Sequence, residues 1–245
     1  MKIRTVNTGK EKMKVYLNKI TGMADALVSM YMSKRTWTPE LDKEIREDWE
    51  NYWSPFDFEG DERTIKRIES FCKYAWMHTT MLDFVTISAT VEGIHRAGQD
   101  DWDAHACRFN NRIIRASTRL ADFEEGEMSD FYKDKIVPLG VVADSILKLP
   151  DKMLINGKEY VRTVNGYILE ELKNDRDVKR GLYMESIPSN FIFKCNMAQW
   201  AHVYRLRNKN GTANPEVKQL AEMLQDEVEK QMPWFDREFL AKVMI

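Results

Sequence analysis

Residues 78–97 read HTTMLDFVTISATVEGIHRA, and residues 99–120 continue through the acidic QDDWDAHA into the basic CRFNNRIIRASTRL. Residues 82–91 are rich in β-branched side chains, which predicts a strand. A helix is predicted to begin near Gly93 and to pass Trp102, and the basic residues 108–120 are predicted to form a loop or a helix start. This stretch therefore predicts a strand followed by a helix, with charged side chains gathered after them.

Imidazole and guanidinium groups are concentrated in this stretch. Guanidinium groups bind phosphate or carboxylate in bidentate fashion, and the hydroxyls of Ser117 and Thr118 would complete an anion site. The alternative is the solvated face of a helix, because the chain holds 37 Lys and Arg among 245 residues. The groups concerned are His78, His95, His105, Arg96, Arg108, Arg112, Arg115 and Arg119.

Outside this stretch the sequence predicts helices and a few strands. Alternation at Met13, Val15 and Leu17 predicts a strand, and Asn156-Gly157 between two β-rich runs predicts a hairpin. Residues 165–181 have helical spacing, and a strand at 191–193 is predicted to lead into a helix whose Asn196, Gln199, His202 and Arg207 face a common site. Further helices are predicted at 22–34, 38–53, 64–77 and 215–232.

Composition narrows the function classes. A net charge of −2 argues against a surface that coats a nucleic acid polymer. Three widely spaced cysteines lack the paired spacing of a zinc site, so we expect no metal and a reducing, cytoplasmic compartment. No segment approaches the ~20 apolar residues that cross a bilayer, so we expect no membrane association.

Two blocks of this sequence resemble the flavin-dependent thymidylate synthases. That family reads H-T-S, E-H, E-G-x-S-R-A, R-H-R and S-x-R at fixed intervals. Here the same intervals give His78-Thr79-Thr80, Asp83-Phe84, Glu92-Gly93-Ile94-His95-Arg96-Ala97, Ala104-His105-Ala106 and, after a short insertion, Ser117-Thr118-Arg119.

The second block covers residues 187–207, where the family has an L-P turn, a strand, an asparagine-bearing helix and a closing arginine. Asn196 and Arg207 keep their types and their spacing. His202 stands where the family usually has an asparagine that contacts flavin. The resemblance spans roughly residues 60–245, so residues 1–60 are expected to be divergent and residues 151–165 to be a hairpin insertion in one domain spanning residues 1–245.

The resemblance implies an α+β fold with a mixed or antiparallel sheet flanked by helices, as in thymidylate synthase complementing proteins. It implies methylation of dUMP, or a related pyrimidine nucleotide, at C5 with methylene-tetrahydrofolate, NADPH and FAD. Family members are homotetramers with shared active sites. The implied catalytic residues are Arg207 and Ser117; the nucleotide would contact Ser117, Arg119 and Arg207; and the flavin would contact His78, Arg96, His105, Asn196 and His202.

Three positions depart from the family pattern. Ala104 and Ala106 replace the two arginines of R-H-R, and Phe84 replaces a histidine, all expected flavin ligands. Each lost charge-assisted hydrogen bond removes ~1.5–3 kcal/mol of affinity unless nearby arginines compensate. The alternative function is therefore a non-catalytic nucleotide-binding or structural relative that has lost the flavin site. Structural alternatives also exist for single residues: His78 as a helix C-terminal cap, and Arg96 as an ion-pair partner of Glu92.

Overall fold

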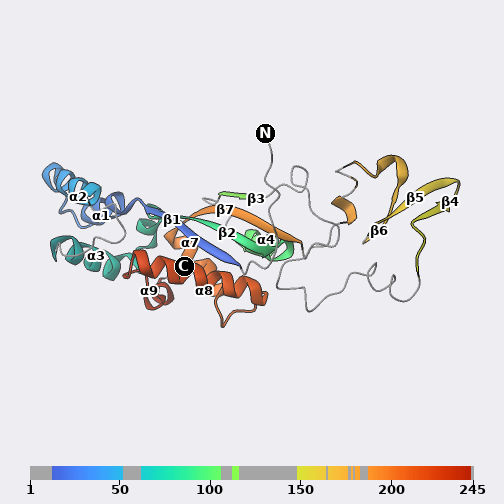
Figure 1. Ribbon diagram of the computed structural model, residues 1–245. Coiled ribbons are helices and arrows are strands. Elements are labelled where there is room, and N and C mark those ends of the chain that lie inside the picture. Colours follow the sequence, from blue (N-terminus) through green and yellow to red (C-terminus); the bar gives the residue numbers. More distant parts are fainter. Residues whose placement is uncertain are drawn as a thin grey trace. The chain divides into compact units, whose positions relative to one another are not determined.

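The chain divides into two compact units. One contains residues 13–14, residues 92–100 and the described parts of 115–191, and the other contains the described parts of 15–91, 101–114 and 192–245. The computed structural model (Figure 1) describes residues 13–51, 62–105, 112–115, 148–163, 165–175, 178, 180–182 and 187–243.

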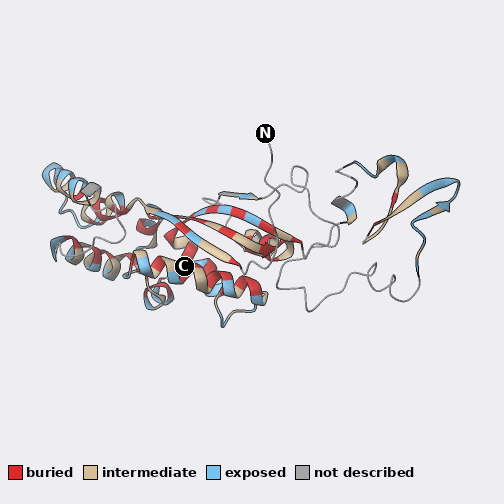
Figure 2. Ribbon diagram, viewed as in Figure 1, coloured by how far each residue is buried: buried red, intermediate tan, exposed pale blue. Residues whose placement is uncertain are grey.

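A four-stranded sheet carries most of the predicted strand residues. Its order is β1 (Lys14–Thr21), β2 (Thr86–His95), β7 (Pro188–Asn196) and β3 (Arg112–Arg115). Buried and more exposed residues alternate along β2 and β7, as Figure 2 shows. One face is therefore apolar, as expected for a half-buried sheet. Its buried side chains include Leu17, Ile87, Ala89, Val91, Phe193 and Cys195.

Three helices after β1 pack together: α1 (Met23–Ser33), α2 (Pro39–Asn51) and α3 (Glu62–Ala75). The Thr38 hydroxyl accepts a hydrogen bond from the Leu41 N–H group (3.2 Å), and proline occupies the first helical position, which confirms the predicted start of α2. Ile45 of α2 and Ile68 of α3 are almost completely buried. The helical predictions for this part of the chain are confirmed.

The C-terminal part contains α7 (Met197–Arg207), α8 (Pro215–Gln231) and the short α9 (Arg237–Lys242). Helix α7 contacts both α8 and α9. Inside this group the fully buried Gln225 accepts a hydrogen bond from the Trp200 indole N–H (2.8 Å) and donates to the Phe235 carbonyl (2.7 Å). One amide thus connects both long helices to the turn that precedes α9.

Residues 152–169 form a separate three-stranded antiparallel sheet of β4 (Lys152–Ile155), β5 (Lys158–Thr163) and β6 (Gly166–Leu169). Asn156 and Gly157 have φ values of 54° and 76°, the left-handed conformation that a two-residue hairpin turn requires. The predicted hairpin is confirmed. Its status as an insertion remains a prediction.

Several predicted elements begin at a different residue or are of a different type in the structure. Strand β2 begins at Thr86, because Thr79–Asp83 forms a 3₁₀ helix, η1, whose Met81 and Leu82 are buried. Residues 112–115 form strand β3, not a loop or helix start, and residues 166–169 form strand β6, not a helix. Strand β3 pairs with β7 and strand β6 pairs with β5, and local spacing in the sequence does not reveal the stabilisation that comes from such pairing.

The carboxylate of Glu222 illustrates how the C-terminal helices are held. It accepts hydrogen bonds from the Tyr204 hydroxyl (3.2 Å), the Lys209 N–H (2.9 Å) and the Arg237 guanidinium (3.1 Å). Burial alone would raise the pKa of Glu222, but these donors outweigh burial and hold the pKa below its usual value. Burial also raises the pKa of Tyr204 to about 12.

We therefore expect the stability that Glu222 provides to be present above its unfolded pKa of about 4.3 and to be lost as the pH falls through its lower folded pKa. Glu222→Gln should lower the urea midpoint at pH 7 and should lose less further stability on acidification to pH 3 than wild type. Glu69→Gln, a change at an exposed glutamate, is the control. Parallel acid profiles of the wild type and Glu222→Gln would contradict this expectation.

Candidate functional site

The two blocks of the family resemblance meet where η1 packs against the start of α7. The Asn196 amide donates to the Asp83 carboxylate (2.7 Å), and the Met197 N–H donates to the Val85 carbonyl (2.8 Å). These bonds join residues more than a hundred positions apart in the chain. The structure therefore brings together the Asp83-Phe84 position and the asparagine-bearing helix.

Asn196 is the N-cap of α7. Its amide oxygen accepts a hydrogen bond from the Gln199 N–H (2.8 Å), and the residue is 3% exposed. Asp83 lies at the surface beside it, and partial burial raises the pKa of Asp83, an effect that the Asn196 hydrogen bond opposes. Phe84 is 51% exposed. Both the oxygen and the nitrogen of the Asn196 amide therefore make hydrogen bonds that hold the structure together.

Asn196→Ala should lower the free energy of unfolding by about 1–2 kcal/mol, because the first turn of α7 loses its cap and Asp83 loses its donor. Asn196→Ser keeps a cap acceptor and should recover about half of that loss. Urea denaturation of the two variants measures the difference. An alanine variant as stable as wild type would show that the cap is dispensable.

Arg207, at the other end of α7, is 6% exposed. Its Nη2 atom donates to Asp101 Oδ1 (2.8 Å) and to the Asp101 carbonyl (3.2 Å). Its Nε atom is buried and has no hydrogen-bond partner among the described residues. The guanidinium thus keeps donor capacity after its ion pair is made.

A cluster of two arginines and an aspartate lies in the other compact unit. Asp100 of α4 (Arg96–His105) pairs with Arg96 (Nε to Oδ2, 3.7 Å) and with Arg115 of β3. The helical spacing assumed for a pair of Arg96 and Glu92 is wrong, because Glu92 lies in β2 and the helix begins at Arg96. Two arginines therefore share the carboxylate of Asp100.

The remaining predicted site residues are distributed as follows. His78 is exposed, precedes η1, and its ring lies 4.3 Å from that of Tyr74, in the last turn of α3. His202 is exposed on α7, whereas Asn196 and Arg207 are buried, so the helix does not present them on one common face as predicted. His105 ends α4, but the description does not extend to its side chain, and Ser117 and Arg119 lie outside the described residues.

Asn196 and Arg207 also stand at opposite ends of α7. Eleven residues separate them, which corresponds to about 16 Å along a helix axis. The two side chains therefore cannot contact the same small group of a ligand. Any ligand that reaches both must extend along the helix.

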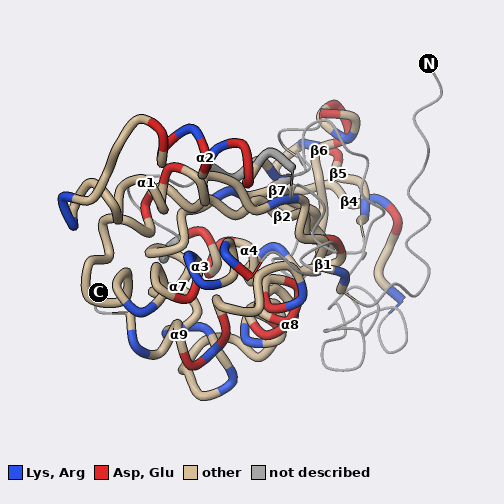
Figure 3. The backbone as a smooth tube through the Cα atoms, turned by 90° about the vertical axis from the view of Figure 1, so that its left-hand side faces the viewer, with Lys and Arg blue, Asp and Glu red and all other residues tan. Residues whose placement is uncertain are grey.

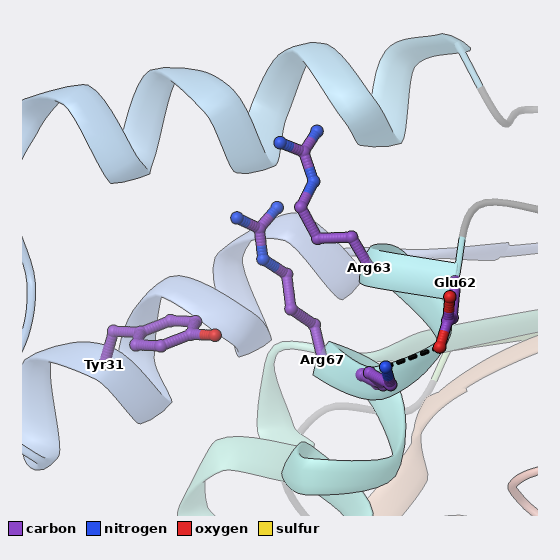
Figure 4. A pocket seen from close by; sticks show the side chains of 5 residues that line it. Tyr31, Glu62, Arg63 and Arg67 are labelled. Carbon is purple, nitrogen blue, oxygen red and sulfur yellow. Dashed lines mark hydrogen bonds and ion pairs between the residues drawn. The ribbon is translucent and has the colours of Figure 1, made fainter.

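A cavity of about 490 Å³ lies at α3, away from these residues (Figure 4). Arg63 and Arg67 point from α3 toward α2, and each donates to Asp48 (2.7 Å). Figure 3 likewise shows acidic and basic residues side by side on α2. The cations are already neutralised, so the cavity is a weak candidate for an anion site. Its lining is Tyr31, Glu62, Arg63, Lys66 and Arg67.

Sequence reasoning missed two acidic residues that hold predicted site residues. Asp83 was noted only as a replacement for glutamate, and Asp101 was part of an acidic run. Nothing in their local spacing identifies Asn196 or Arg207 as their partners, because both contacts are tertiary. Among the described residues, no group of three or more His, Cys, Asp or Glu side chains is arranged to hold a metal ion.

Comparison with known families places these residues in context. The family model of the thymidylate synthase complementing protein, Thy1, matches residues 20–234. The chain belongs to this family. The match includes residues 20–60, which the sequence motifs did not cover. A search of the curated proteins found no match.

Solved structures show the same fold as this family member and confirm the expected α+β class. ThyX from Helicobacter pylori, solved with FAD and dUMP, is 14% identical, with 93% of this chain and 99% of that chain covered and a TM-score of 0.54. The UMP/dUMP methylase PolB from Streptomyces cacaoi, bound with 5-Br dUMP, is 13% identical, with 95% and 96% covered and a TM-score of 0.57. At these identities the likeness concerns the fold.

The described residues of this family member do not fit a flavin. Asn196 is buried and engaged by Asp83 and Gln199, and Arg96 is already paired with Asp100. Alanines stand where two family arginines are expected, and the exposed Phe84 replaces a histidine. No free cation for the flavin phosphates is therefore found among these described positions.

Within the described residues, no helix combines the length and the apolar character needed to traverse a bilayer.

Proposed function

We propose that this protein binds a pyrimidine nucleotide, dUMP or UMP, and transfers a one-carbon unit to C5 of its ring. The observation that carries the proposal is Arg207, which keeps the family's position at the end of α7 and is buried with donor capacity to spare. Membership of the thymidylate synthase complementing proteins supports it. So do the ligands of the structural neighbours, which were solved with dUMP, 5-Br dUMP or 5-Br UMP.

In this proposal Arg207 donates to a carbonyl oxygen of the pyrimidine and favours negative charge that develops on the ring. Ser117 and Arg119 bind the nucleotide phosphate, as the family resemblance implies. Methylene-tetrahydrofolate supplies the carbon, NADPH supplies the electrons, and the proton on C5 is lost. The main task of these side chains is to orient the nucleotide.

The second candidate function is nucleotide binding without flavin chemistry. This function is favoured because both ends of the Asn196 amide are already hydrogen-bonded within the protein. The residues Ala104, Ala106 and Phe84, which replace expected flavin ligands, favour it as well. His78, His105 and His202 then have no flavin to contact.

We also propose a homotetramer with shared sites, as the family resemblance implies. Light scattering of the purified chain tests this proposal. A monomer at micromolar concentration would count against it.

Isothermal titration separates the two candidate functions. We expect dUMP or UMP to bind with a Kd in the micromolar range, equivalent to about 8 kcal/mol. FAD is titrated separately into the same preparation. A protein that shows no flavin absorbance but still binds dUMP favours nucleotide binding without flavin chemistry. Absence of binding by both nucleotides at millimolar concentration would refute the proposal.

A further inference from the structure

Asp101 forms the best-defined contact of the proposed pyrimidine-binding arginine. The Arg207 side chain is 8% exposed and the Asp101 side chain 31%. Nη2 donates twice to this residue, once to the carboxylate and once to the main-chain carbonyl. Two acceptors on one residue fix the plane of the guanidinium as well as its position.

The helix that carries Asp101 is anchored by its neighbour, Trp102. Trp102 is 1% exposed, packs edge-on against Phe193 (5.5 Å between ring centroids) and lies 6.0 Å from Trp200. Trp200 belongs to α7, the helix that ends in Arg207. Because packed aromatic rings resist displacement, the two helices keep Asp101 and Arg207 in register.

The pair also changes what Arg207 can recognise. A carboxylate in contact with the guanidinium cancels its charge, and it repels a phosphate that approaches the same group. A neutral carbonyl oxygen meets no such repulsion, and it can accept from the guanidinium N–H groups that Asp101 leaves unused. Among the described residues, Arg207 Nε has no hydrogen-bond partner.

We propose that Asp101 is a positioning residue that holds Arg207 by one edge and directs its remaining donors to the neutral carbonyl oxygens of a pyrimidine, not to a phosphate. The ligand part of this inference rests on the proposed function. With Asp101 in place, Arg207 recognises the base of the nucleotide and not its phosphate. Other residues of the site must then bind the phosphate. Removing the carboxylate should weaken binding of the base and leave the contribution of the phosphate unchanged.

The test compares dUMP with deoxyuridine, which lacks the phosphate, by isothermal titration of the full chain. Asp101→Ala should weaken both ligands by about 10-fold, the loss of roughly one charge-assisted hydrogen bond, with an unchanged ratio of the two affinities. Asp101→Asn keeps an acceptor oxygen and should return both to within about 3-fold of wild type. Asp103→Asn, the same charge change on the same helix, is the control. Unchanged affinities in Asp101→Ala, or a loss of affinity for dUMP that clearly exceeds the loss for deoxyuridine, would overturn the inference.

A ligand-independent measurement keeps failure of the inference distinct from failure of the proposed function. Thermal midpoints are measured for Asp101→Ala, Arg207→Met and the double variant. Coupling between the partners predicts that the double variant loses less than the sum of the single losses. Additive losses would refute the pairing role. Coupling in a protein that binds neither ligand would leave the pairing role intact and refute only the proposed function and the ligand preference that rests on it.

Discussion

Arg207→Ala should raise the Kd for dUMP by about 100-fold or more. The guanidinium is buried and oriented by Asp101, so it contributes donors to a ligand without a further cost of ordering. Loss of two charge-assisted hydrogen bonds corresponds to about 3 kcal/mol, and each 1.4 kcal/mol is a factor of about 10. Isothermal titration with dUMP measures the change.

Arg205→Ala is the matched control, because Arg205 is exposed in the same last turn of α7 and contacts the Val243 carbonyl (2.6 Å) at the C-terminal end. It removes the same charge from the same helix. Its Kd for dUMP should stay within about 3-fold of wild type. If both variants weaken dUMP equally, the effect is one of net charge and Arg207 has no special role.

Gln225→Leu should lower the free energy of unfolding by about 3–5 kcal/mol. Leucine has a similar size, so the effect arises from lost hydrogen bonds and not from a cavity. The substitution leaves the Trp200 indole N–H and the Phe235 carbonyl without their hydrogen-bond partner, and both residues are fully buried. It also removes the donor to the Glu229 carboxylate (3.0 Å). Urea denaturation at a fixed protein concentration measures the loss.

Gln219→Leu provides the comparison, since Gln219 is exposed on the same helix, α8. Its free energy of unfolding should change by less than about 0.5 kcal/mol. A loss below about 1 kcal/mol in Gln225→Leu would mean that water or a rearranged partner replaces the amide.

Elements with strong local signals were predictable from the sequence. The apolar stripe at Val217, Leu220 and Leu224 and the Asn214-Pro215 start specify α8 without reference to the rest of the chain. Likewise, Thr38 accurately marks the start of α2. The family motifs identified Asn196 and Arg207 by their residue types and their spacing.

Features that depend on tertiary contacts were not predictable. Strand β3 has only four residues and exists by pairing beside β7, and η1 replaces the start of a predicted strand where Met81 and Leu82 become buried. The partners of Asn196 and Arg207, Asp83 and Asp101, are more than a hundred positions away in the chain. Spacing along one sequence contains no information on such pairs.

Release of tritium from the C5 position of dUMP or UMP tests the proposed methylation most directly. In a complete mixture with methylene-tetrahydrofolate, NADPH and FAD, we expect release that depends on time and protein concentration and is lost in Arg207→Ala. The reason is that transfer of a carbon to C5 expels the hydrogen bound there. A protein that binds dUMP but releases no tritium from either nucleotide would contradict the methyltransferase and leave the nucleotide-binding relative.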